Sequence, residues 1–268
     1  MQSPLLNRLT ASALIAGLLG FSSIAQAAVV NSTGSGNWST DAIWSGGAGP
    51  LNRPVSGDTV NILSGHTVTN DFGGGFLDGT YTINVSGALN DPGSVFRVNG
   101  STISVGSTGS LGGGSFWDLQ NGTFTFDDGA TVNMATWEQK GTNVFNFNLS
   151  ASGFNALTPG TFAIGFDGSG QDITRATYNV DMANYNGGIG TIALADFTTD
   201  GFGMDNTAFQ GAAGLNVNNK GAFTGSYLQW NDATEAIELV VAVPEPSTYA
   251  LIGGCFALGA VMLRRRQR

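Results

Sequence analysis

Three sets of apolar residues recur together at an interval of about 21 residues over the region 55–140. No other feature of the sequence restricts the fold as much. The sets are Ile62, Ile83, Ile103 and Phe124; Val68, Leu89, Leu111 and Val132; and Phe76, Phe96, Trp117 and Trp137. Because all three sets stay in phase over four repeats, each repeat is expected to stack its apolar sides on those of the next repeat.

The repeats also carry a strand pattern. Apolar and polar residues alternate over residues 80–85, 101–105 and 122–126, which indicates half-buried strands rich in β-branched and aromatic side chains. Glycine clusters such as 73–75 and 112–114 separate the strands as tight turns. The chain has 41 Gly in 268 residues, about twice the average usage, as expected if its corners need positive φ or a close approach of neighbouring coils.

Three short strands per repeat predict an all-β protein, a right-handed parallel β-helix (solenoid). An antiparallel sandwich, which also spaces short strands by roughly 8–12 residues, is the alternative. After residue 140 the period fades, but alternating runs continue, and residues 223–230 and 236–241 flank a five-residue loop that suggests a hairpin. We expect repeats with an N-terminal cap over 28–140 and a C-terminal β cap or small sandwich over 141–242, within one elongated domain.

The N-terminal edge needs a cap, because an open solenoid end exposes unpaired strand groups. Trp38 and Trp44 are close in the sequence and can fold over the first coil; a sugar-stacking platform is the alternative. With Pro50 and Gly57-Asp58, this segment resembles the opening of many exported bacterial β-solenoid proteins with autotransporter-like repeats. We expect the tryptophans to serve the cap.

Residues 1–27 have the features of a secretory signal peptide. Arg8 supplies a positive charge, an apolar run follows over residues 9–24, and Ala25-Gln26-Ala27 is a small-residue cleavage motif. We therefore expect cleavage between Ala27 and Ala28.

The C-terminal segment, residues 243–268, predicts a transient membrane anchor. Pro244-Glu245-Pro246 keeps the backbone extended, a form that a protease can bind. The apolar segment 249–263 would, as a helix, span about 22 Å against about 30 Å of hydrocarbon. Arg264, Arg265 and Arg266 follow it and would hold the C-terminus on the cytoplasmic side. We expect one short transmembrane helix beside a processing site.

These C-terminal features, residues 243–268, resemble the PEP-CTERM sorting signal of Gram-negative bacteria. The resemblance implies that an exosortase, a membrane cysteine peptidase, recognises Pro244, Glu245 and Pro246 and cuts the signal. It also implies that the body leaves the inner membrane for the cell surface or the extracellular matrix. The sorting tail itself does not indicate what the body does.

The charge of the body excludes several classes of function. Residues 28–243 contain 18 acidic and five basic residues, a formal charge of −13, so we expect no nucleic-acid partner. One Cys and one His in the whole chain exclude a disulfide scaffold and a multi-Cys/His metal site. An acidic surface is compatible with neutral or cationic polysaccharides.

Few residues could support catalysis. Ser/His/Asp chemistry could use only His66, which is expected in a turn. Asp127 and Asp128 are adjacent, but they fall in a predicted turn, whereas a glycosidase needs two carboxylates roughly 5–9.5 Å apart. Asp167 and Asp172 lie in a glycine-rich loop that could hold Ca²⁺, without the glycine and glutamate of an EF-hand. We expect no catalytic residue, no cofactor and no metal site.

The sequence therefore predicts a non-enzymatic structural or adhesive protein, exported and processed by an exosortase, with exopolysaccharide as a candidate partner. Two alternatives use the same scaffold: a polysaccharide-active enzyme (glycosidase or lyase) and a sugar-binding module.

Overall fold

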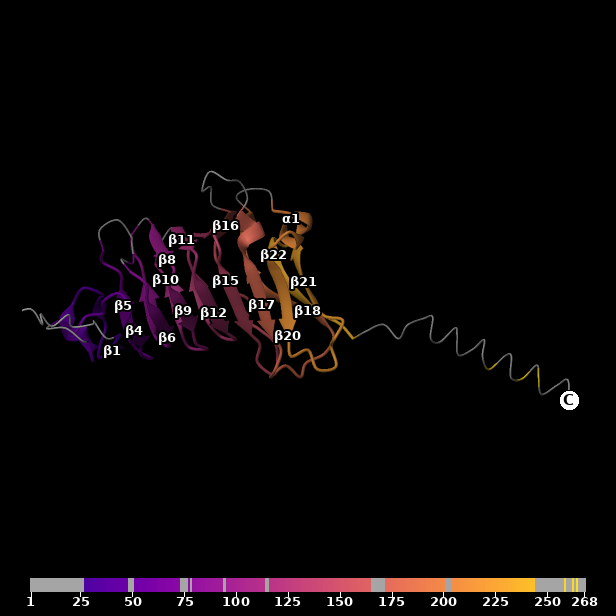
Figure 1. The fold of residues 1–268 in the computed structure, drawn as a ribbon, viewed down its shortest axis with the longest axis horizontal. Helices are drawn as coiled ribbons and strands as arrows, with labels where there is room; N and C mark the ends of the chain where they lie inside the picture. Colours follow the sequence, from indigo (N-terminus) through magenta and orange to yellow (C-terminus); the bar gives the residue numbers. More distant parts are fainter. Residues whose placement is uncertain are drawn as a thin grey trace, which may run out of the picture.

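The computed structural model describes residues 27–47, 51–72, 77, 79–93, 95–113, 116–164, 172–200 and 204–243, together with Leu258, Met262 and Arg264. These residues form a β-solenoid, and its coils are stacked along the long axis of the molecule (Figure 1). The predicted all-β solenoid is therefore confirmed, and the antiparallel sandwich is wrong for the repeats, because successive coils pair in parallel.

Three sheets, which we call A, B and C, form the sides of the solenoid. Sheet A contains β20 (Gly214–Asn218), β17 (Thr177–Asp181), β15 (Val144–Asn148), β12 (Thr123–Asp127), β9 (Thr102–Val105), β6 (Thr82–Val85), β4 (Thr59–Ile62), β1 (Val29–Ser32) and β3 (Trp44–Ser45). Sheet B contains β13 (Thr131–Asn133), β10 (Ser110–Gly112), β7 (Ala88–Asn90), β5 (Thr67–Thr69) and β2 (Gly36–Asn37). Sheet C contains β19 (Thr199–Asp200), β16 (Thr161–Ile164), β14 (Thr136–Lys140), β11 (Phe116–Gln120) and β8 (Phe96–Asn99).

The strand registers confirm two of the predicted apolar sets and correct the third. The sheet B set pairs as predicted, from Val68 to Val132, and the aromatic set of sheet C pairs from Phe96 to Trp137. In sheet A, however, Ile83 pairs with Val60, and the predicted Ile62 pairs with Val85. Val60 and Ile62 lie on the same side of the strand and both face the interior, so alternation alone cannot choose between them. Phe76 lies outside the described residues.

The interior of sheet A changes from aliphatic to aromatic along the axis. Val60, Ile83 and Ile103 give way to Phe124, Phe145 and Tyr178 on successive coils. The ring centroids of Phe124 and Phe145 lie 5.4 Å apart, and those of Phe145 and Tyr178 lie 5.3 Å apart, in stacked arrangements. Burial of one such ring contributes roughly 1.5–3 kcal/mol.

Two glycines show how the corners allow the coils to approach. Gly129 has φ of 92°, which other residues rarely adopt. A Cβ atom on Gly109 would collide with the backbone carbonyl oxygen of Val85, one coil away. Both positions require glycine for a local reason.

The parallel sheet continues well beyond residue 140, because β15, β17 and β20 extend sheet A. The solenoid then closes with a three-stranded antiparallel sheet, which we call sheet D, of β18 (Gly190–Asp196), β22 (Ala236–Val241) and β21 (Tyr227–Asn231). Sheet D includes the predicted hairpin, whose loop is one residue shorter than expected because Asn231 belongs to β21. The ring of Trp230 packs 5.7 Å from that of Phe162, and α1 (Asn206–Gln210) contacts β21.

The N-terminal end is closed by the two predicted tryptophans, beside a short 3-10 helix, η1 (Asp41–Ile43). Their ring centroids are 5.3 Å apart, and Trp44 Nε1 donates a hydrogen bond of 2.8 Å to the carbonyl oxygen of Trp38. Trp38 is 0% exposed and Trp44 is 3% exposed. Both rings are buried, as the cap prediction requires, and the sugar-stacking alternative is wrong because neither ring can meet a ligand.

Candidate functional site

The outer face of sheet A carries a regular array of uncharged polar side chains. In each strand the residue between the two inward-facing residues points outward, and the registers align these residues from coil to coil. We call them the asparagine column: Asn31, Asn61, Asn84, Ser104, Thr125, Asn146, Asn179 and Asn216. Neighbouring members are about 4.8 Å apart, the spacing of paired strands.

The amides of this column bond to one another. The hydrogen bonds run from Asn61 to Asn31, from Asn84 to Asn61, from Asn179 to Asn146 and from Asn216 to Asn179, each with Nδ2 donating to Oδ1 over 2.8 Å. Asn146 Nδ2 also donates to Thr125 Oγ1 over 3.2 Å. An amide has two N–H groups and two lone pairs, so each asparagine retains a donor and an acceptor for a ligand.

A second outward column lies two residues earlier on the same strands. This threonine column comprises Thr59, Thr82, Thr102, Thr123 and Thr177, with Val144 between the last two. The two columns are about 6.6 Å apart along the strands. Neither contains a charged residue, so this part of the acidic body is a neutral surface of hydroxyl and amide groups.

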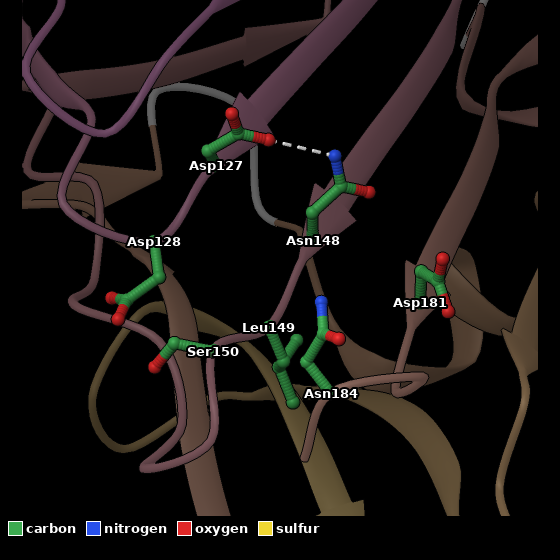
Figure 2. A pocket seen from close by; sticks show the side chains of 7 residues that line it. All are labelled: Asp127, Asp128, Asn148, Leu149, Ser150, Asp181 and Asn184. Atoms are coloured by element: carbon green, nitrogen blue, oxygen red, sulfur yellow. Dashed lines mark hydrogen bonds between the residues drawn. The ribbon is translucent and has the colours of Figure 1, made fainter.

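Two adjoining hollows lie beside the array, near the ends of β12, β15 and β17. Figure 2 shows the residues that line the first of them. The first has a volume of about 370 Å³ and is lined by Asp127, Asp128, Asn148, Leu149, Ser150, Asp181 and Asn184. The second has a volume of about 530 Å³ and is lined by Thr125, Asn146, Asn148, Asn179, Asp181, Asn218 and Asn219. The hollows share Asn148 and Asp181, so they adjoin each other. They lie beside the part of the asparagine column that runs from Thr125 to Asn179.

The carboxylates of these hollows hold the local backbone and side chains. Asp127 Oδ1 accepts a hydrogen bond of 2.8 Å from Asn148 Nδ2, as Figure 2 shows, and Asp128 Oδ1 accepts one of 2.7 Å from the backbone N–H of Asn155. Asp181 Oδ1 accepts hydrogen bonds from Ala183 N and Asn219 Nδ2. Asn148 stands between Asp127 and Asp181 in the register. The adjacent pair Asp127 and Asp128 is thus tied to two different segments of the chain.

His66 also has a structural partner. Its Nδ1 lies 2.8 Å from Ser32 Oγ, which in turn accepts the backbone N–H of Leu63 over 2.9 Å. The serine hydroxyl is therefore bonded to both the imidazole and the backbone. Ser32 is 1% exposed, so it cannot attack a substrate, and the pair ties β1 to the turn before β5.

The outer face of sheet C differs, because it carries a cluster of ion pairs. Asp118 Oδ2 lies 3.1 Å from Arg97 Nε and 3.2 Å from Lys140 Nζ, and Lys140 Nζ lies 2.7 Å from Glu138 Oε2. Asp118 is 1% exposed. A 3-10 helix, η2 (Asp172–Arg175), contacts β14.

Burial and charge act on two groups of this cluster. Burial raises the pKa of Glu138, and this effect outweighs the hydrogen bond to Lys140. Burial acts to lower the pKa of Lys140, but the hydrogen bond to Glu138 and the charge of Asp118 reverse the direction and raise that pKa. Both interactions favour the charged form of Lys140 near neutral pH.

Neither surface was singled out from the sequence, although both follow the repeat. Arg97 and Asp118 are separated by one interval of the apolar sets, and so are Asp118 and Glu138. The asparagine column likewise follows each sheet A core position directly in the sequence. Up to residue 140, the repeat interval applied to polar residues indicates both surfaces, whereas beyond it the steps to Asn179 and Asn216 are too long for the interval to predict them.

The predicted metal and sorting residues are only partly described. Asp167, Pro244, Glu245, Pro246, Arg265 and Arg266 lie outside the described residues, as does most of the predicted segment 249–263. Asp172 is described only as the first residue of η2, and Arg264 as an exposed residue in helical conformation. Within the described ranges, no three His, Cys, Asp or Glu side chains are grouped to hold a metal ion. The same ranges contain no helix long and apolar enough to cross a membrane.

Comparison with known proteins and families gives a match for the tail only through a family model. No curated protein and no solved structure matches the chain. The family model described as the PEP-CTERM protein-sorting motif matches residues 242–266, which begin directly after β22. This match covers the tail and not the solenoid. The chain therefore carries a PEP-CTERM protein-sorting motif, which implies export and recognition by an exosortase.

Proposed function

We propose that the chain is a non-enzymatic structural or adhesive protein of the cell surface or extracellular matrix. In this proposal residues 1–27 direct export, residues 249–263 hold the chain at the inner membrane, and the exosortase releases the body. The supporting observation is the position of the motif. The backbone N–H of Ala242 still donates to Ser226 Oγ over 3.0 Å, so the closed solenoid reaches as far as the first residue of the motif. Removing the tail would leave a complete folded body.

The array on sheet A supports a polysaccharide as the matrix partner. A polymer lying along the solenoid axis would meet a hydrogen-bonding side chain at every coil, about every 4.8 Å. Hydroxyl groups both donate and accept hydrogen bonds, as do the amides and hydroxyls of the two columns. The formal charge of −13 on residues 28–243 disfavours an anionic polymer, and the two columns carry no charge that would attract a cationic one, so the proposed partner is a neutral polysaccharide.

A glycosidase or lyase is less well supported. Asp127, Asp128 and Asp181 are engaged as acceptors of structural hydrogen bonds. Two of the five basic residues of the body, Arg97 and Lys140, are paired with carboxylates on the other face of the solenoid. We therefore propose no catalytic residue. The role of Asp167 and Asp172 as calcium ligands remains a prediction.

The sorting step is tested with the full chain in a host that carries an exosortase. The variant P244A/E245A/P246A should stay with the cells and keep its terminal arginines, because its recognition residues are gone. The wild-type chain and the control D232A/T234A, changed in the exposed hairpin loop, should be found outside without those arginines. Mass spectrometry of both fractions measures this. Release of the triple variant in wild-type amount with the same C-terminus would show that the motif is not the signal.

Polysaccharide binding is tested with the protein recovered from outside the cells. We expect it to sediment with an insoluble neutral glucan and not with an insoluble anionic polysaccharide. The variant N84D/N146D places two charges in the asparagine column and should lose most of this binding. The control N90D/N133D places two charges on the outer face of sheet B and should bind as wild type does. Equal binding by both variants would contradict a role for sheet A, and release of shortened sugars would favour the enzyme.

A further inference from the structure

Asp58 joins the first strand of the body to the loop before the second coil. It lies directly before β4 and is 1% exposed. Its Oδ1 accepts a hydrogen bond of 2.8 Å from the backbone N–H of Ala28, and its Oδ2 accepts one of 2.8 Å from the backbone N–H of Val55. The carbonyl oxygen of Ala28 in turn accepts the N–H of Thr59 over 2.8 Å. Hydrogen bonds through both the N–H and the carbonyl group of Ala28 therefore fix the position of its nitrogen.

The predicted signal cleavage changes the chemistry of this nitrogen. Hydrolysis of the Ala27–Ala28 bond adds one water, leaves a carboxylate on Ala27 and converts the amide N–H of Ala28 into an α-ammonium group. The neutral donor that faces Asp58 would become a positive charge at the same atom. A buried carboxylate is costly without an opposite charge, and an ion pair of this kind offsets part of that cost.

We propose that Asp58 is the binding site for the α-ammonium group created by signal cleavage at Ala28. This inference rests on the export part of the proposed function and is independent of the sorting tail and of any polysaccharide. It also gives a reason for the Gly57-Asp58 segment noted in the sequence. Removal of the signal peptide completes the first coil, because it supplies the charge that the Asp58 carboxylate lacks in the precursor.

The other charged groups at this end are bonded to other residues or exposed, except Asp41, which is half-buried and whose buried Oδ1 has no hydrogen-bond partner among the described residues. Among the described residues they are Asp41 in η1, Arg53 on the exposed loop before Asp58, His66, which is bonded to Ser32, and Asp71, which is bonded to Ser39. In the described structure the Ala28 nitrogen donates its hydrogen bond to Asp58 Oδ1.

The ion pair predicts a pH dependence with a defined sign. An α-amino group has an ordinary pKa of about 7.7–8.0, and an adjacent carboxylate raises it in the folded protein. A raised pKa means that the stabilisation is fully present below the ordinary value and is lost as the pH rises through the higher, folded-state value. The window therefore lies above about pH 8.

The test uses the protein released from the cells, with its N-terminus determined by mass spectrometry. A Gly-Ser dipeptide inserted between Ala27 and Ala28 moves the ammonium group away but keeps Asp58 and a neutral N–H at Ala28. For the wild type we expect Tm to fall by about 3 °C between pH 7 and pH 9.5, which corresponds to a shift of about one pKa unit. The insertion variant should lose most of this fall.

D58N should also lose this pH dependence, and the insertion variant keeps the proposal testable if D58N does not fold. An equal fall in Tm for the wild type and the insertion variant would overturn the ion pair. A mature N-terminus at a residue other than Ala28 would overturn the site itself. That result is distinct from a failure of the sorting proposal, which depends on the C-terminus.

Discussion

Sheets A and C are built from the same coils, but their outer faces differ in charge and in how their side chains are paired. Sheet A displays uncharged, half-buried amides and hydroxyls that bond along the column. Sheet C displays Arg97, Asp118 and Glu138 in register, with the carboxylate of Asp118 almost completely buried. The asparagine and threonine columns of sheet A are therefore neutral, with carboxylates only at their edge, whereas the outer face of sheet C is charged and internally paired.

The difference follows from stacking. A solenoid places equivalent side chains about 4.8 Å apart, so an outward residue interacts first with its own counterparts. Amides both donate and accept, and therefore a column of asparagines satisfies itself. Carboxylates on successive coils repel each other, so Asp118 and Glu138 need Lys140, whose Nζ lies 3.2 Å from one carboxylate and 2.7 Å from the other. We infer that self-satisfied columns can face a ligand, whereas charged columns serve the stability of the body.

The largest expected effect is on sheet C. D118A leaves Arg97 and Lys140 without their shared carboxylate and should lower the free energy of unfolding by about 2 kcal/mol, less than for a fully buried pair because both cations reach solvent. D127A, which removes one hydrogen bond at the edge of the sheet A columns, should cost only about 0.5 kcal/mol. Urea denaturation measures both. Equal losses would show that the two faces do not differ in this way.

The repeat predicted much of the fold, because core positions depend on spacing. The interval predicted the sheet B set because a single inward residue recurs there, and it predicted the Phe96 to Trp137 set because these aromatic residues differ from the aliphatic inward residues Val98 and Leu119 beside them. It did not fix the first coil of sheet A, where two inward residues compete. Beyond residue 140 the sheet continues, but the step from Phe145 to its partner Tyr178 is much longer than the step from Phe124 to Phe145. Inserted loops removed the period while the pairing persisted.

The candidate site was harder to predict, because its residues are ordinary in sequence. Asn84 and Asn146 are each the polar partner in an alternating strand, and their hydrogen bonds appear only when separate coils are stacked. Conversely, Asp127-Asp128 and His66 drew attention by residue type, and the structure gives them hydrogen bonds within the scaffold. The role of Trp38 and Trp44 was predictable because an open solenoid end requires a cap.

A smaller effect is expected within the asparagine column. Asn146 donates to Thr125 and accepts from Asn179, so N146A breaks two bonds and should cost about 1 kcal/mol. N216A, at the end of the column, breaks one bond and should cost about half as much. N133A, on the exposed outer side of sheet B, is the control and should have little effect. If the three variants unfold at the same urea concentration, the bonds along the column do not contribute to stability.

The smallest effect concerns pH and again separates the two faces. Burial raises the pKa of Glu138 above its unfolded value, so between these two values the folded protein holds a proton that the unfolded chain releases. The free energy of unfolding contributed by this group therefore increases as the pH falls from 7 into the window just above the ordinary pKa of about 4.3. E138Q cannot titrate there and should show a smaller gain between pH 7 and pH 5.

Two comparisons isolate this contribution of Glu138. Asp91, whose pKa burial also raises, acts in the same direction in the wild type and in E138Q, and so it cancels between them. N146A, which changes no titrating group, should keep the wild-type pH dependence. An E138Q profile parallel to that of the wild type would mean that Glu138 keeps the same pKa on unfolding, and that sheet C tolerates its charge as readily as an exposed surface would.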